Sequence, residues 1–113
     1  MLSKKDLIET NKLFHNGKVI NESSLDFAVI SVQRSRNWLK AAAILCRAIL
    51  IDHVFEDGNK RTGAAVIAAI MELNNIPFHP ERIDQCVLAI SKNNIANLKK
   101  IQQVITNVRE HIP

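Results

Sequence analysis

Glycine, proline and cysteine are scarce in this chain of 113 residues, which has three Gly, three Pro and two Cys. So few turn-forming residues, with almost no alternation of apolar and polar positions, argue against a β-rich domain. Tyrosine is absent, tryptophan occurs once, and Lys and Arg form no dense block. The net charge of +4 therefore comes without the basic and aromatic clusters of a nucleic-acid-binding surface, and no direct nucleic-acid role is expected.

The two cysteines and the apolar runs indicate the cellular compartment of the protein. Cys46 and Cys86 lie too far apart in the sequence for a CxxC metal or redox pair, so we expect two buried, reduced thiols, as is usual in the cytoplasm. The longest uncharged apolar stretch, from Thr62 to Met71, is about half the roughly 20 residues that a membrane helix needs. The N-terminal residues show no apolar signal segment. We therefore expect a cytoplasmic protein without a membrane segment.

The residue pattern predicts an all-α fold. The length suits one domain over residues 1–113, and the periodicity predicts a compact bundle of about six helices joined by short turns. Two of these helices, at 38–51 and from Asn59 to about Glu72, carry almost no charge along their length. Helices of this kind are surrounded by neighbours, so they are expected at the centre. Gly63 and the alanines after it allow close approach of the backbones.

Capping residues and apolar spacing predict the remaining helices. Ser3 and Asp6 form a capping box for a first helix that is expected to continue to about Phe14. Ser24 is the expected N-cap of the second helix, and Asn37 that of the third. The inward residues of the first helix are expected to be Leu7, Leu13 and Phe14. Two outer amphipathic helices are predicted from Ile83, Val87 and Ile90, and from Ile95, Leu98, Ile101, Ile105 and Val108.

Polar residues of several kinds concentrate between the two central helices, where residues 53–63 read HVFEDGNKRTG. This segment predicts a helix–loop–helix with His53 after the first helix, Asp57 in the turn, and a Gly-Asn-Lys-Arg run at the start of the second. Unpaired N–H groups and the positive end of the helix dipole make such a start an anion site. Lys60 and Arg61 would repel that dipole end unless an anion such as a nucleotide phosphate lies between them.

The run HVFEDGNKR resembles the HxFx[D/E]GN[G/K]R signature of Fic/Doc proteins, and its NKRT form is most similar to the death-on-curing (Doc) toxins. The motif match covers nine residues, and the resemblance in architecture extends over about residues 2–108. It implies an enzyme that transfers part of ATP to a Ser or Thr hydroxyl of a protein. A Doc-like toxin transfers phosphate to a translation elongation factor and is neutralised by a small antitoxin supplied in trans.

The resemblance also implies a role for each matched residue. His53 corresponds to the general base that takes the proton of the attacking hydroxyl, a role that imidazole can fill near neutral pH. Phe55 corresponds to the apolar anchor of the loop, and Asp57 to the carboxylate that holds Mg²⁺ against the phosphates. With His53 and Asp57, Arg61 is among the catalytic residues. The residues that bind phosphate are Gly58, Asn59, Lys60 and Arg61.

Two departures from the signature bear on which group is transferred. Fic proteins that transfer AMP usually have Gly after the Asn and a second Arg three residues after the first, where this chain has Lys60 and Ala64. Both differences favour phosphate transfer, with AMP transfer as the alternative. A catalytically inactive helical module that only binds a protein is a second alternative, which the intact motif residues disfavour.

Other parts of the chain match the family less well. An inhibitory helix in Fic proteins carries [S/T]xxxE[G/N]; here Thr106 to Glu110 gives TxxxE, but His111 follows, so we do not expect an intrinsic inhibitor. His15 and His79, like His111, match no motif position and are expected at the surface or at helix ends.

Overall fold

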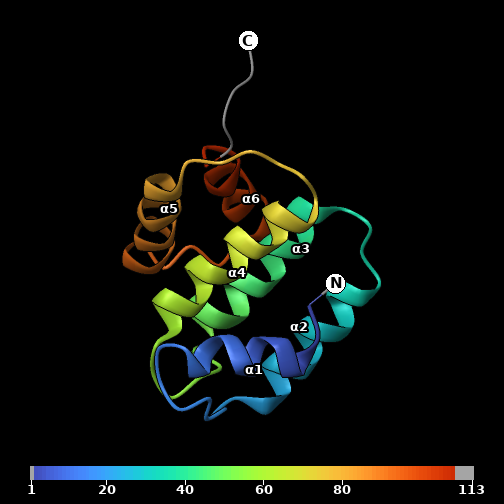
Figure 1. Ribbon diagram of the computed structural model, residues 1–113, viewed down its shortest axis with the longest axis vertical. Coiled ribbons are helices and arrows are strands. Elements are labelled where there is room, and N and C mark those ends of the chain that lie inside the picture. The colour runs from blue at the N-terminus through green and yellow to red at the C-terminus, as the bar shows by residue number, and fades with distance from the viewer. Residues whose placement is uncertain (1, 109–113) are drawn as a thin grey trace.

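The computed structural model describes residues 2–108, which form six α-helices and no β-strand (Figure 1). The helices are α1 (Lys4–Lys12), α2 (Glu22–Gln33), α3 (Trp38–Cys46), α4 (Asn59–Leu73), α5 (Pro80–Lys92) and α6 (Leu98–Thr106). The prediction of an all-α bundle of about six helices is confirmed. Within the described residues, no helix has the length and apolar character needed to cross a bilayer.

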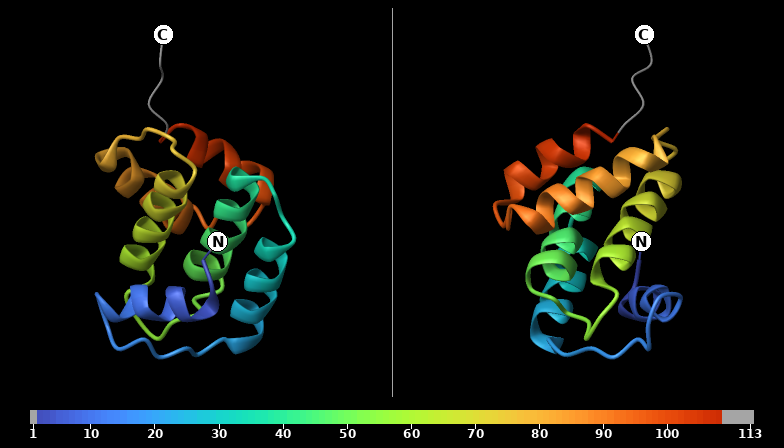
Figure 2. Two further views of the ribbon diagram at one scale, coloured as in Figure 1. Left: turned by 45° about the vertical axis from the view of Figure 1, so that its right-hand side comes forward. Right: turned by 90° about the vertical axis from the view of Figure 1, so that its left-hand side faces the viewer.

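The centre of the bundle is formed by α3 and α4, which lie side by side in both views of Figure 2. A π-helical turn, η1 (Arg47–Ile51), continues α3 toward the polar loop. At Gly63 a Cβ atom would lie only 2.9 Å from the Leu50 side chain, so glycine permits the close approach of α4 to η1. The outer helices cover this pair, with α6 against α3 and α5 against α4. The predicted central pair is thus confirmed.

The first helix ends earlier than the sequence predicts. Its last residue is Lys12, and the two apolar residues that follow are not in the core, since Leu13 is 76% and Phe14 37% exposed. The carbonyl of Asn11 accepts hydrogen bonds from the Phe14 and His15 N–H groups, and its side-chain Oδ1 accepts one from the Gly17 N–H. These bonds turn the chain away from the helix axis. The prediction that Leu13 and Phe14 pack inward was wrong.

The second helix begins before the predicted cap. Asn21 is its N-cap, and the Ser24 N–H donates to Asn21 Oδ1 at 3.3 Å. The same side chain donates from Nδ2 to the Asp52 carbonyl, so the cap also ties α2 to the end of η1. Ser24 was therefore the wrong cap, whereas Asn37 caps α3 as predicted, by accepting from the next turn's N–H groups.

The outer helices follow their predicted apolar faces. Ile83, Val87 and Ile90 are buried on α5. Ile101 and Ile105 are the buried residues of α6, and Val108, just beyond its end, is 1% exposed. The TxxxE segment from Thr106 to Glu110 extends outside the described residues, as does His111.

Both cysteines are free and buried, as expected. Burial raises the pKa of Cys86 to about 12 and raises that of Cys46 further. Because the thiolate is the reactive form, we expect neither cysteine of the native protein to react at neutral pH with a thiol reagent such as DTNB, whereas both should react in denaturant. Rapid labelling of the native protein would contradict this account of the core.

Candidate active site

The polar loop between η1 and α4, residues 53–58, is fastened to the bundle by its apolar residues. Val54 and Phe55 are both 0% exposed, and Phe55 is among the largest fully buried side chains of the described core. The chain before α2 pairs with this segment: the Ile20 N–H donates to the Val54 carbonyl at 2.8 Å, and the Glu56 N–H donates to the Lys18 carbonyl at 3.0 Å. The polar residues around Phe55 are therefore held at fixed positions.

Asn59 shapes the loop from inside. Its Oδ1 accepts from the Phe55 N–H at 3.2 Å, and its Nδ2 donates to the Phe55 carbonyl at 2.9 Å. The side-chain amide thus serves as the hydrogen-bond partner of both the N–H and the carbonyl of Phe55, in place of backbone groups. The backbone N–H of Asn59, at the first position of α4, has no partner within the helix.

A buried asparagine outside the motif holds the other side of the loop. Asn11, 0% exposed on α1, donates from Nδ2 to the Asp57 carbonyl at 2.9 Å and to Thr62 Oγ1 at 3.0 Å. Thr62 in turn donates to the Gly58 carbonyl at 2.8 Å. Because Asn11 also accepts from the Gly17 N–H, one side chain joins α1, the loop and α4.

Gly58, the N-cap of α4, occupies a position that glycine suits. Its backbone is left-handed, with φ of 74° and ψ of 14°. A Cβ atom there would lie 3.2 Å from Asn11 Nδ2 and 3.3 Å from the His15 Cβ. An L-residue would therefore be strained and crowded at the turn that presents the start of α4.

The start of α4 opens into a hollow of about 540 Å³. This hollow, here called the phosphate hollow, is lined by Phe14, His53, Glu56, Asp57, Gly58, Asn59, Lys60 and Arg61. No side chain caps the first turn of α4, and no acidic residue lies in that turn. The structure thus brings all the predicted polar site residues to one hollow with unpaired N–H groups, Lys60 and Arg61 at its edge. That combination suits a polyanion.

His53 stands at the entrance to this hollow on a strained backbone. Its φ is 50°, a left-handed value that is uncommon for a residue other than glycine. The side chain is exposed and lines the hollow. Since strain of this kind costs about 1–3 kcal/mol and persists where the surroundings impose it, the loop holds the His53 backbone at the edge of the phosphate hollow.

Asp57 is the one predicted metal ligand. Its Oδ1 accepts from the Gly58 N–H at 2.7 Å, and the carboxylate is exposed to the phosphate hollow. Among the described residues, no cluster of three or more His, Cys, Asp or Glu side chains would hold a metal ion by itself. This donor set fits Mg²⁺, which is commonly bound by one or two carboxylates together with phosphate oxygens of the substrate.

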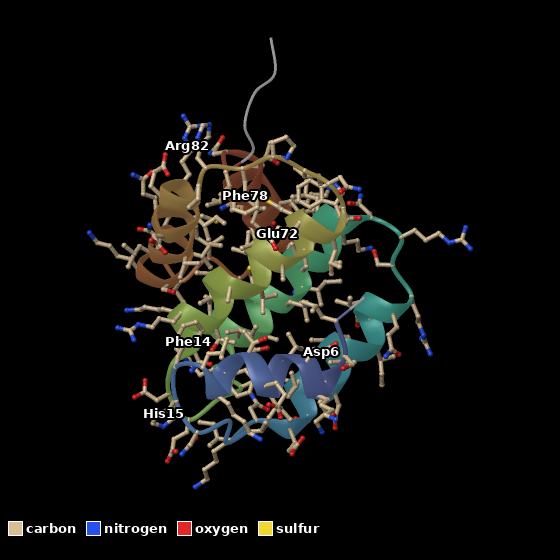
Figure 3. All side chains as sticks on the ribbon, viewed as in Figure 1. Asp6, Phe14, His15, Glu72, Phe78 and Arg82 are labelled. Atoms are coloured by element: carbon tan, nitrogen blue, oxygen red, sulfur yellow. The ribbon has the colours of Figure 1, made fainter. Side chains whose placement is uncertain are left out.

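Glu56 and His15 form the outer edge of the site. A hydrogen bond from Asn16, with Lys18 nearby, lowers the pKa of the exposed Glu56 carboxyl. His15 Nε2 lies 3.5 Å from Glu56 Oε2. His15 is therefore at the surface as predicted, but beside the loop, and Figure 3 shows it close to Phe14 at the end of α1.

Sequence reasoning missed two residues of this site. The one sign of Asn11 in the sequence is its place one helical turn after the buried Leu7, on the apolar face of α1, where a polar residue needs a buried partner. Phe14 was assigned to the core, but it lines the phosphate hollow. Its place follows from the early end of α1, which periodicity does not reveal.

Comparison with known proteins agrees with the motif. A model described as the Fic/DOC family matches residues 7–71, which is more than half of the chain. The match begins on α1 and ends in α4, so it includes Asn11 and the whole loop. No curated protein and no solved structure matched. The chain belongs to the Fic/DOC family, whose members are generally transferases that act on proteins.

Proposed function

We propose that this protein is a Doc-like toxin that transfers the γ-phosphoryl group of ATP to a Ser or Thr hydroxyl of a protein, with a translation elongation factor as the target. The observation that carries the proposal is Lys60 at the start of α4, where it lines the phosphate hollow beside His53. An ammonium group there adds charge and bulk where AMP-transferring relatives have glycine. The position of a second phosphate-binding Arg is taken by Ala64, which lies in an apolar groove.

In the proposed reaction His53 takes the proton of the target hydroxyl. The hydroxyl oxygen forms a bond to the γ-phosphorus, the bond from that phosphorus to the β–γ bridging oxygen breaks, and ADP leaves with the bonding electron pair. Arg61 and the N–H groups of α4 bind the phosphate oxygens, and their positions are set before substrate binds. Asp57 would hold Mg²⁺, which supplies charge neutralisation at the phosphates when bound.

Labelled ATP separates the two transfer reactions. We expect label from [γ-³²P]ATP, and not from [α-³²P]ATP, to appear on protein when the purified chain is incubated with a cell extract and Mg²⁺. Transfer of the α-label would instead support the AMP-transferase alternative. Absence of both labels would support a binding module.

Nucleotide binding gives a prediction for Arg61. ATP with Mg²⁺ should raise the melting temperature of the protein, because a ligand that binds only the folded state stabilises it. Arg61→Ala should abolish most of that shift with little change in the melting temperature without ATP, since Arg61 is exposed and lies near the positive end of α4. In Asp57→Asn, the shift in melting temperature that ATP still produces should depend less on Mg²⁺ than it does in the parent. A thermal titration of the three proteins checks this, and an undiminished shift in Arg61→Ala would place the nucleotide elsewhere.

The proposed antitoxin has a suitable surface next to the site. A groove of about 350 Å³ follows α4 toward α5 and is lined mainly by small and aromatic side chains. Phe14 lies at one end and Phe78 at the other, as Figure 3 shows along the length of α4. The groove shares Phe14 and Arg61 with the phosphate hollow. An apolar segment of an antitoxin bound there would therefore reach Arg61 and compete with the nucleotide.

A further inference from the structure

A second hollow meets the phosphate hollow at His53. It measures about 500 Å³ and lies between the start of α4 and the end of α5. Leu50, Leu88, Ser91 and Lys92 line it, together with three residues that also line the phosphate hollow, His53, Asn59 and Lys60. His53 thus borders both hollows, and a molecule in either one would lie beside it.

The chemistry of the two hollows differs. Both loop carboxylates, Glu56 and Asp57, line the phosphate hollow together with Arg61. The lining of the second hollow includes two cations, Lys60 and Lys92, and no carboxylate. Its charge is therefore positive without a built-in counter-ion, which favours an acidic occupant.

The second hollow also has polar and apolar contacts to offer. Ser91 Oγ is the one buried side-chain polar atom that lacks a hydrogen-bond partner in the part of the chain that the structure describes. An orphaned hydroxyl costs free energy unless a ligand or water pairs with it. Leu88 is 55% exposed at the rim, and Leu50 is buried beneath. Apolar contact beside a few polar groups is the usual composition of a binding pocket.

We infer that this hollow binds the segment of the target protein that carries the reacting hydroxyl, and that this segment is acidic. The inference rests on the proposed function, because a general base must lie within hydrogen-bond reach of the acceptor hydroxyl, and the oxygen of that hydroxyl must also reach the γ-phosphorus. With the ATP phosphates in the phosphate hollow beside Asp57, the acceptor segment enters through the second hollow, past Ser91 and Lys92, and its hydroxyl lies between His53 and the γ-phosphorus. Its hydroxyl proton passes to His53 in the step described above.

Peptide binding without nucleotide tests this inference. The probes are two fluorescent peptides of equal length with a central Thr, one flanked by Asp and Glu and the other by Lys and Arg, titrated into the full chain. The acidic peptide should bind at least about tenfold tighter than the basic one, with a difference that shrinks as salt rises. Equal binding of the two peptides would overturn the inference.

Two variants of the hollow and one control variant locate the binding. Lys92→Glu should weaken the acidic peptide about tenfold, because it reverses a charge at the hollow and leaves the phosphate side intact. Lys40→Glu makes the same charge reversal on an exposed residue near the start of α3, whereas His53 follows the end of η1. This control variant should leave binding unchanged. Ser91→Ala should weaken the peptide without lowering the melting temperature, since its hydroxyl bonds to no described residue.

Failure of this inference can be distinguished from failure of the proposed function. If Lys92→Glu instead reduces the thermal shift with ATP and Mg²⁺ and spares peptide binding, the second hollow belongs to the nucleotide and the inference is wrong. If the acidic peptide binds as expected but no phosphate reaches protein, only the proposed reaction fails. His53→Ala should retain the peptide, because it removes the base and neither lysine.

Discussion

Replacing His53 with Ala should lower the rate of phosphate transfer by about 10²–10⁴-fold, the usual contribution of a positioned general base. Expression of the variant should then no longer arrest growth, whereas the parent should do so. The physical reason is that His53 borders both hollows, whereas no other described histidine lines either of them. The rate is measured with [γ-³²P]ATP, and the arrest by growth of an induced culture.

Two control variants show whether the loss of activity comes from removing the His53 imidazole and not from misfolding. His53 has a left-handed backbone, which Asn tolerates better than most residues, so His53→Asn should keep the fold and be equally inactive. His79→Ala removes an imidazole at the start of α5, which lines neither hollow, and should leave the rate unchanged. If His53→Asn transfers phosphate as fast as the parent, the proposed mechanism is wrong.

Replacing Asn11 with Ala should destabilise the protein by about 2–4 kcal/mol, because the Asp57 carbonyl and the Gly17 N–H would lose their partner. Folded domains of this kind are stable by about 5–15 kcal/mol, so this is a large fraction. The loop would also lose its link to α1, and the thermal shift with ATP and Mg²⁺ should fall. Urea denaturation monitored by circular dichroism measures the first effect.

A second substitution at Asn11 separates the loss of its donated hydrogen bonds from the loss of its side-chain volume. Asn11→Asp keeps the shape and can still accept from the Gly17 N–H, but it cannot donate to the Asp57 carbonyl or to Thr62 Oγ1. We expect it to be destabilised almost as much as Asn11→Ala. Asn16 is an exposed residue of the same segment whose hydrogen bonds, to Glu56 and Lys18, lie at the surface, so Asn16→Ala should change stability by about 1 kcal/mol or less. An Asn11→Asp protein as stable as the parent would refute the role given to this side chain.

The fold and the loop were accessible from the sequence for different reasons. The central helices were predictable because they are nearly uncharged, and the loop because its polar residues follow one another in the chain. Asn11 was not, since it contacts Asp57 and Thr62 from a remote part of the sequence. Such a contact leaves only one local sign, a polar residue on an apolar helix face.

Helix ends and the use of each side chain were harder to predict. Ser24 and Asn21 are both good caps, and the bonds that Asn21 makes to the Asp52 and Val54 carbonyls, remote in the sequence, favour Asn21. Asn59 matches a phosphate-binding position, but its amide is used to hold the backbone of Phe55. The second hollow beside His53 depends on how α5 packs against α4, which no local pattern encodes.

Mass spectrometry of a cell lysate, incubated with the purified protein, ATP and Mg²⁺, tests the central claim most directly. The account predicts a Ser or Thr residue of a protein that gains the mass of one phosphoryl group with the parent protein and does not with His53→Asn. A gain of the mass of AMP, or modification to the same extent by both proteins, would contradict it.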